Sequence, residues 1–188
     1  MGGPKALAML ADESFATAAL RAFARPEIAE RVLVLGAAAE RIADDAALPA
    51  NTAVVVNHRW KEGMLTSVVA GLDAALALDA EAVLLHPVDN PLVAHETIAA
   101  VIRALAAGAR IAVPSHGGRR GHPAGFARDA WPALRAAPAD GGARSVLAAH
   151  PDWVVHVPAG PDCLIDLDTP EALEAALGAL RGQGPRRG

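Results

Sequence analysis

The amino-acid sequence predicts an α/β domain whose mainly parallel sheet is flanked by helices. Short runs rich in valine and leucine, such as residues 32–35 and 53–56, are typical of buried strands in a parallel sheet. Between such runs lie segments in which apolar residues recur every three or four positions, which is the period of an amphipathic helix. Strands that alternate with helices in this way form layered α/β folds.

The composition is that of one compact domain. The chain has 188 residues, of which 53% are hydrophobic and 20% charged, and this is enough for a substantial core. We expect a single domain over residues 1–180 and a flexible tail over residues 181–188, which is rich in glycine and arginine. The net charge of −4 argues against nucleic acid as a partner. We expect no membrane segment, no secretion signal and no internal disulfide from the single Cys163, and hence a cytoplasmic protein.

The first half of the chain alternates helices and strands after an opening turn. The expected elements are a short helix over 15–23, a strand over 32–36, a helix over 37–47, a strand over 53–57 and a helix over 63–76. The last helix is the best defined, because Leu65, Val68 and Leu72 lie on one apolar stripe. Gly71 lies inside it, where glycine costs about 1 kcal/mol relative to alanine. A closely approaching ligand and tight packing on the sheet both explain this glycine.

The second half continues the alternation and contains one glycine-rich loop. The expected elements are a strand over 83–85, a helix over 95–108, a strand over 110–114, a binding loop over 115–126, short helices over 130–134 and 143–149, strands over 153–157 and 164–167, and a closing helix. Thr169 suits the N-cap of that last helix and Pro170 its first turn.

Acidic residues follow two of the predicted strands. Asp89 lies between Pro87 and Pro91 directly after the strand over 83–85, and Asp166 and Asp168 lie at the end of the strand over 164–167. Carboxyl ends of parallel strands meet at one edge of a sheet, where α/β folds bind ligands. Mg²⁺ prefers one or two carboxylates together with water and phosphate oxygens, so these acids suit it. Each acid also has a plain structural explanation, as a capping or solvated residue of a turn.

Other catalytic patterns find little support. Lys5 follows Gly2 and Gly3, whose backbone N–H groups can meet a phosphate chain, but the sequence has neither a GxxxxGK[ST] loop nor a GxGxxG fingerprint. The scattered histidines and single cysteine do not suggest zinc or iron, and no serine lies in a GxSxG elbow.

Six motifs occur in one order along the chain. They are Gly2-Gly-Pro-Lys-Ala-Leu7, Gly63-Met-Leu-Thr-Ser-Val-Val-Ala-Gly-Leu72, Asp89-Asn-Pro-Leu-Val93, Gly121-His-Pro123, Gly142-Ala-Arg144 and Asp166-Leu-Asp-Thr-Pro-Glu171. Together they resemble the MobA-like nucleotidyltransferase family, close to the molybdenum-cofactor cytidylyltransferases, over almost the whole chain.

The resemblance implies a Rossmann-like nucleotidyltransferase fold and a role for each motif. The implied activity is Mg²⁺-dependent transfer of a nucleoside monophosphate from an NTP, CTP or GTP, to a phosphorylated acceptor such as molybdopterin, with release of pyrophosphate. The implied roles are catalytic for Lys5 and Asp89, nucleotide-binding for Gly2, Gly3, Lys5, Asn57, Ser67 and Gly71, acceptor-binding for Gly121, His122 and Pro123, and metal-binding for Asp89 and Asp166. His122 also has a plain explanation, as a turn residue. A partner molybdoenzyme or chaperone stays an open question.

The start of the chain departs from the family pattern. Family members begin with a buried strand and a glycine-rich loop of the form LAAGxSxRMGxPKxL, and Met1 corresponds to the methionine of that loop. We therefore expect the first strand of the fold to be missing, with exposed edges on its neighbours and an incomplete phosphate cradle. This leaves an alternative to the enzyme: a non-catalytic nucleotide- or partner-binding protein on the same fold.

Overall fold

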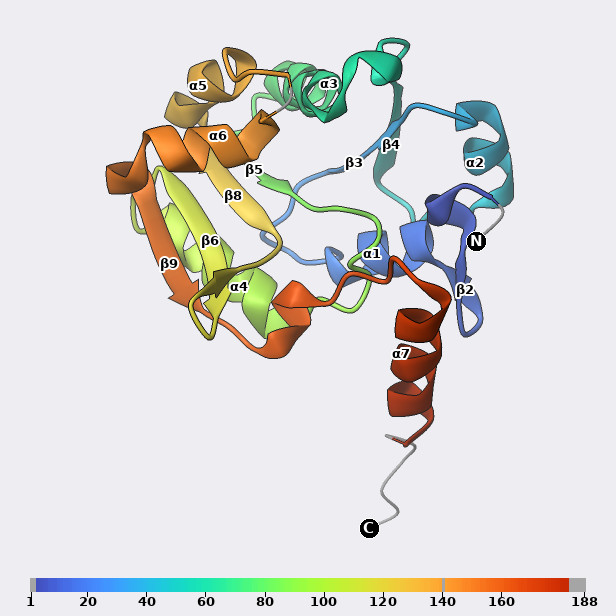
Figure 1. Cartoon of the computed structure of the whole chain (residues 1–188). Coiled ribbons are helices and arrows are strands. Elements are labelled where there is room, and N and C mark those ends of the chain that lie inside the picture. Colours follow the sequence, from blue (N-terminus) through green and yellow to red (C-terminus); the bar gives the residue numbers. More distant parts are fainter. Residues whose placement is uncertain (1–2, 140, 183–188) are drawn as a thin grey trace.

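The computed structural model describes residues 3–139 and 141–182 and has an α/β architecture, with helices packed against its sheets (Figure 1). The strands are β1 (Met9–Leu10), β2 (Glu13–Ser14), β3 (Arg31–Leu35), β4 (Thr52–Val56), β5 (Ala82–Leu85), β6 (Ile111–His116), β7 (Arg119–Arg120), β8 (Ala124–Ala127) and β9 (Val154–Pro158). The α-helices are α1 (Phe15–Ala22), α2 (Ala39–Asp45), α3 (Met64–Ala77), α4 (His95–Ala106), α5 (Trp131–Arg135), α6 (Gly142–Ala149) and α7 (Pro170–Gly182). Short 3₁₀ helices are η1 (Lys5–Leu7), η2 (Trp60–Glu62), η3 (Arg128–Ala130), η4 (Pro151–Trp153) and η5 (Pro161–Leu164).

The largest sheet is mixed, which corrects the expectation of a mainly parallel one. β8 lies antiparallel between β5 and β6, β7 forms a hairpin with β6, and β9 runs parallel to β6 on its other side. The glycine-rich loop explains the difference. Gly117 and Gly118 adopt φ values of 56° and 77°, so the chain reverses after β6 and returns antiparallel to it. The glycine-rich segment, whose sequence predicts a turn with two extended arms, therefore supplies β7 and β8, and their pairing within the sheet is what the sequence patterns do not predict.

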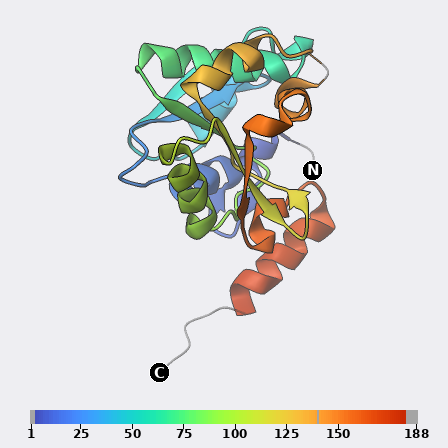
Figure 2. The ribbon, with the colours of Figure 1, turned by 90° about the vertical axis from the view of Figure 1, so that its left-hand side faces the viewer.

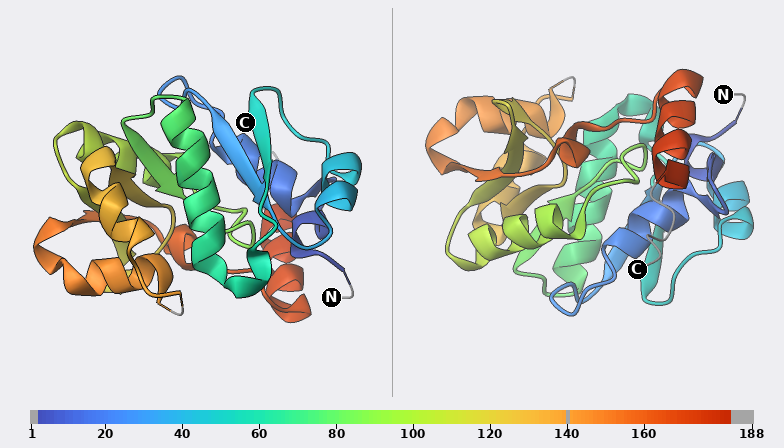
Figure 3. Two further views of the ribbon diagram at one scale, coloured as in Figure 1. Left: turned by 90° about the horizontal axis from the view of Figure 1, so that it is seen from above. Right: turned by 90° about the horizontal axis from the view of Figure 1, so that it is seen from below.

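β3 and β4 form a separate parallel pair. Among the described residues, β3 pairs only with β4 and β5 only with β8, so each keeps one edge without a strand partner. Helix α3 packs against β3 and β5, which do not pair with each other (Figure 3). A Cβ on Gly71 would lie 3.4 Å from Val34 Cγ2 of β3, and Leu72 packs in one cluster with Val83 and Leu85 of β5. A Cβ at this position would make an ordinary contact with β3, and the nucleotide-binding role of Gly71 stays a prediction.

Helices α3, α5 and α6 enclose the main core against the five-stranded sheet. Phe126 of β8 and Leu134 of α5 are fully buried there. Val101 of α4 packs on Ala112 of β6 in a second cluster. Helix α1 packs against β3, with Ala16 and Leu35 in one cluster. These clusters include Leu35 at the carboxyl end of β3 and Leu85 at the carboxyl end of β5, the strand after which Asp89 follows.

The C-terminal segment differs from the expectation at one point. The predicted strand over 164–167 is wrong: η5 occupies residues 161–164, and the N–H of Leu167 donates to the carbonyl of Asp89 at 2.7 Å instead of to a strand. The predicted N-cap is confirmed, because Thr169 Oγ1 accepts from the N–H of Ala172 at 3.2 Å. Helix α7 then extends beyond the main body (Figure 2).

Residues 181 and 182 of the predicted tail belong to α7, and residues 183–188 lie outside the described residues. Within residues 3–139 and 141–182, no helix is both long and apolar enough to cross a membrane.

Candidate functional site

Three charged side chains from distant parts of the sequence meet in one cluster. Lys5 Nζ donates to Asp89 Oδ2 at 3.1 Å and also forms an ion pair with Asp168 Oδ1. Lys5 comes from η1 at the start of the chain, Asp89 from the turn after β5, and Asp168 from the segment before α7. The Asp89 side chain is 22% exposed and that of Asp168 is 56% exposed, so the cluster is open to a ligand.

The charges of this cluster support one another. Hydrogen bonds to Asp168 and then to Asp89 hold the pKa of Lys5 above its usual value. The hydrogen bond from Lys5 in turn holds the pKa of Asp168 below its ordinary range. Two carboxylates and one ammonium leave a formal charge of −1, so the cluster has negative charge to offer to a further cation.

The donor set fits Mg²⁺ bound together with phosphate. Mg²⁺ takes one or two carboxylates from a protein and completes its octahedron with water and phosphate oxygens. Asp89 and Asp168 already share one cationic group, the Lys5 ammonium, and therefore lie close enough to serve one cation. In the part of the chain that the structure describes, no group of three or more His, Cys, Asp or Glu side chains is positioned to hold a metal. A cation here would take its remaining ligands from water and, when the substrate is bound, from its phosphate oxygens.

Asp166 does not pair with Lys5 in the described structure, but its charge acts on the same histidine as that of Asp89. Among the described residues, the ion pairs of Lys5 go to Asp89 and Asp168. The charge of Asp166 acts on His122, whose pKa is lowered by burial, with Asp166 and then Asp89 opposing that effect. Lys5 thus pairs with Asp168, while both Asp166 and Asp89 lie near enough to His122 for their charges to act on it, and the metal role of Asp166 stays a prediction.

Hydrogen bonds to two backbone carbonyls shape the turn that carries Asp89. His86 Nε2 donates to the carbonyl of Asn90 at 2.8 Å, and the N–H of Asn90 donates to the carbonyl of Pro87 at 3.3 Å. The carboxylate of Asp89 does not cap this turn; its hydrogen bond in the described structure is to Lys5. These hydrogen bonds do not support the plain explanation of Asp89 as a capping residue, and its metal-binding role stays a prediction.

The predicted nucleotide residues Asn57 and Ser67 lie together. Asn57 follows β4 and is 5% exposed, and its Nδ2 donates to Thr66 Oγ1 at 2.8 Å and to Ser67 Oγ at 3.0 Å. Its Oδ1 accepts from the N–H of Arg59 at 2.9 Å. The amide of Asn57 is therefore used in holding the first turn of α3 in place. Gly3 has open space around it, and the predicted Gly2 lies outside the described residues.

The predicted acceptor loop packs on the segment before α7. The N–H of His122 donates to the carbonyl oxygen of Cys163 at 2.9 Å, and a Cβ on Gly121 would lie 2.3 Å from that oxygen. Pro123 is fully buried beside them. The same carbonyl accepts from Asn90 Nδ2 at 3.3 Å. Asn90 and Cys163 are contacts that the sequence patterns did not single out, although Asn90 adjoins Asp89 in one of the motifs.

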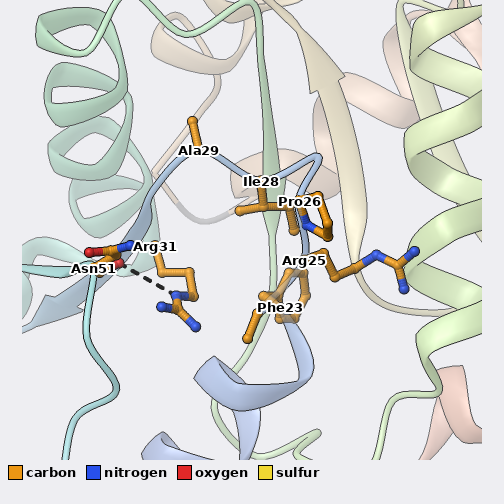
Figure 4. A pocket seen from close by; sticks show the side chains of 8 residues that line it. Phe23, Arg25, Pro26, Ile28, Ala29, Arg31 and Asn51 are labelled. Atoms are coloured by element: carbon orange, nitrogen blue, oxygen red, sulfur yellow. Dashed lines mark hydrogen bonds between the residues drawn. The ribbon is translucent and has the colours of Figure 1, made fainter.

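A separate cavity of about 250 Å³ lies at the amino end of β3 (Figure 4). Its lining contains two arginines and no carboxylate. One of them, Arg31, donates through Nε to the carbonyl of Asn51 at 3.4 Å, so its guanidinium is engaged with the backbone. The acids of the candidate site follow β5 and η5, and this cavity is not part of that site.

Comparison with known proteins places these features in a family. The sequence pattern of the MobA-like NTP transferase domain matches residues 1–154. No curated protein matches the chain. Rv0371c from Mycobacterium tuberculosis H37Rv is 27% identical, with 95% of this chain and 90% of that chain covered and a TM-score of 0.80. Its complex with manganese gives 26% identity, 94% and 93% coverage and a TM-score of 0.73.

Two more distant structures share the fold. One is 2-C-methyl-D-erythritol 4-phosphate cytidylyltransferase from Thermus thermophilus, which is 23% identical, with 96% of this chain and 95% of that chain covered and a TM-score of 0.70. The other is molybdopterin-guanine dinucleotide biosynthesis protein A from Archaeoglobus fulgidus, with 17% identity, 97% and 93% coverage and a TM-score of 0.64.

Proposed function

The chain belongs to the MobA-like NTP transferase family, and from this premise we propose that it transfers a nucleoside monophosphate from CTP or GTP to a phosphorylated acceptor such as molybdopterin. An oxygen of the acceptor phosphate attacks the α-phosphorus of the NTP. The bond from that phosphorus to the bridging oxygen of the β-phosphate breaks, and pyrophosphate leaves with the electron pair. The observation that carries this proposal is the meeting of Lys5, Asp89 and Asp168.

The cluster offers the two kinds of charge that this reaction needs. Mg²⁺ held by Asp89 with Asp166 or Asp168 would neutralise the phosphate oxygens as charge moves to pyrophosphate. Lys5 supplies a fixed positive charge, because its raised pKa keeps the ammonium protonated throughout the neutral range. The manganese complex of the mycobacterial relative supports a divalent cation in this fold. When the NTP binds, the Lys5 ammonium exchanges carboxylate partners for phosphate oxygens.

The nucleotide would lie along the start of α3. Ser67 and Gly71 belong to this helix, and Asn57 holds its first turn through two hydroxyl groups. The first backbone N–H groups of a helix and its dipole favour an anion at that end. Gly2 and Gly3 would contribute further backbone N–H groups to the phosphates.

The acceptor requires little help from a protein base. The second ionisation of a phosphomonoester lies near pH 6, so the attacking oxygen is already anionic at neutral pH. Gly121, His122 and Pro123 would line the acceptor side. Burial lowers the pKa of His122, so the imidazole is neutral and can accept or donate one hydrogen bond without adding charge.

The test is pyrophosphate release with CTP or GTP, Mg²⁺ and molybdopterin. We expect Asp89→Ala to lower the rate by at least about a hundredfold, because a metal ligand of the transition state is lost. Asp73→Ala is the matched control, since Asp73 is an exposed carboxylate on α3 that pairs with Arg135 at 2.6 Å; it should keep the wild-type rate. An unchanged rate in Asp89→Ala would refute the proposal. CTP binding without release of pyrophosphate from any NTP would instead support the non-catalytic binding protein.

A further inference from the structure

One buried carbonyl joins the three segments that carry the predicted site residues. The oxygen of Cys163 accepts from the His122 N–H at 2.9 Å and from Asn90 Nδ2 at 3.3 Å. Asn90 directly follows Asp89, His122 lies in the acceptor loop, and Cys163 precedes Asp168 by five residues. We call the three hydrogen-bonded residues Asn90, His122 and Cys163 the Cys163 junction. The junction links the metal acids to each other and to the acceptor loop.

The asparagine at this junction is placed for geometry and not for stability alone. Asn90 and Cys163 are both fully buried. The Nδ2 of Asn90 donates one long hydrogen bond, to the carbonyl of Cys163. Its Oδ1 is buried and has no hydrogen-bond partner among the described residues. An apolar side chain of similar size would avoid the cost of burying this oxygen. A half-satisfied buried amide is therefore explained best by the direction that its one hydrogen bond imposes.

The hydrogen bond of Asn90 matters because it is one of two that join the segment of Asp89 to the segment of Asp168. Asn90 Nδ2 reaches the carbonyl of Cys163, and the N–H of Leu167 reaches the carbonyl of Asp89 at 2.7 Å. The donor of the first bond, Asn90, follows Asp89 directly, and the donor of the second bond, Leu167, directly precedes Asp168. Two bonds between two segments prevent rotation of one segment against the other, whereas one bond allows it.

We propose that Asn90 is a positioning residue whose amide holds Asp89 and Asp168 at the spacing that one divalent cation can bridge. This rests on the proposed function, since it concerns the cation of the same site. Loss of the amide leaves the carboxylates present but unfixed, so cation affinity falls. Residues that orient metal ligands without touching the metal commonly change affinity by about 10- to 100-fold when they are replaced.

The experiment measures Mn²⁺ alone, without nucleotide, by the EPR signal of the free ion in titrations of wild type and variants. Asn90→Leu removes the Nδ2 donor and keeps a side chain that branches at Cγ. We expect it to raise the Kd for Mn²⁺ about tenfold or more. Thr97→Val is the matched control: Thr97 is 3% exposed and its Oγ1 donates to Asp162 Oδ2 at 2.9 Å, so it anchors the same η5 from helix α4. Its Kd should change less than about twofold.

The outcomes separate the proposal from its competitors. An unchanged Kd in folded Asn90→Leu overturns it, and so does an equal loss in Thr97→Val, which would mean that loosening η5 in any way is enough. Wild type that binds no Mn²⁺ also overturns it. If Asn90→Leu does not fold, Asn90→Ser is judged by the same criterion, because serine is too short to reach the Cys163 carbonyl. Mn²⁺ binding that depends on Asn90 in a chain that transfers no nucleotide would sustain this inference and refute the proposed function.

Discussion

The buried imidazole of His86 makes the stability of this protein depend on pH in a specific range. Its Nε2 donates to the carbonyl of Asn90 at 2.8 Å, which leaves Nδ1 as a bare acceptor, buried and without a partner in the described structure. Burial lowers the pKa of His86 from 6.5 to about 4. The folded protein therefore keeps this imidazole neutral at pH values where the unfolded chain protonates it.

The sign and the size follow from these two values. Because the folded pKa lies below the unfolded one, the unfolded state binds the extra proton, and the stability contribution is lost as the pH falls from 6.5 towards 4. A difference of about 2.5 pH units between the two pKa values corresponds to about 3 kcal/mol at the acid limit. At pH 5 the loss is already about 2 kcal/mol by the same relation.

Urea unfolding at pH 7.5, 6 and 5 measures this contribution. His86→Gln is the informative variant, because glutamine can still donate to the Asn90 carbonyl but cannot take up a proton in this range. The free energy of unfolding of wild type should fall by about 2 kcal/mol more than that of the variant between pH 7.5 and pH 5. His58→Gln is the control, since His58 is exposed after β4, and it should follow the wild-type curve. Equal pH dependence of wild type and His86→Gln would refute the reasoning.

Two further substitutions test the contacts around the site. Gly121→Ala should destabilise the fold by about 1–3 kcal/mol in urea unfolding, because its Cβ would lie 2.3 Å from the Cys163 oxygen and the segment would have to move; unchanged stability would mean that this packing is looser than described. Lys5→Met should weaken CTP binding measured by calorimetry, because a positive charge at the phosphates is lost, and should raise the pKa of Asp168, as followed by NMR titration, since the Lys5 ammonium is what holds that pKa down. An Asp168 pKa that stays low in Lys5→Met would contradict this account.

Much of the fold follows from local patterns. The apolar stripe of α3 and the strand–turn–helix around Asp89 depend on periodicity and proline, which act within a few residues. Strand pairing depends on where distant segments meet, so the insertion of β8 between β5 and β6 was outside the reach of these patterns. The strand expected over 164–167 failed for a related reason, because the Leu167 N–H serves Asp89 and not a neighbouring strand.

The candidate site likewise has residues that local patterns identify and residues whose role depends on tertiary placement. The sequence identified Lys5 and Asp89, and the structure brings them into contact. Asp166 and Asp168 lie two residues apart, so in an extended segment they face the same side and local pattern does not choose between them. Only the tertiary placement of the segment brings Asp168 to Lys5. Asn90 was missed as a contact because a buried asparagine and a surface asparagine look alike in sequence.

The two sides of the candidate site are attached to two different sheets. Ala6, next to Lys5, packs with Leu35 of β3, whereas Asp89 follows β5, and among the described residues no backbone ladder joins β3 to β5. The distance between Lys5 and Asp89 is thus set by side-chain packing, which yields more readily than a hydrogen-bonded sheet. A triphosphate with its cation would bridge both sides. Its binding energy would then be divided between holding the substrate and drawing the two halves of the protein together.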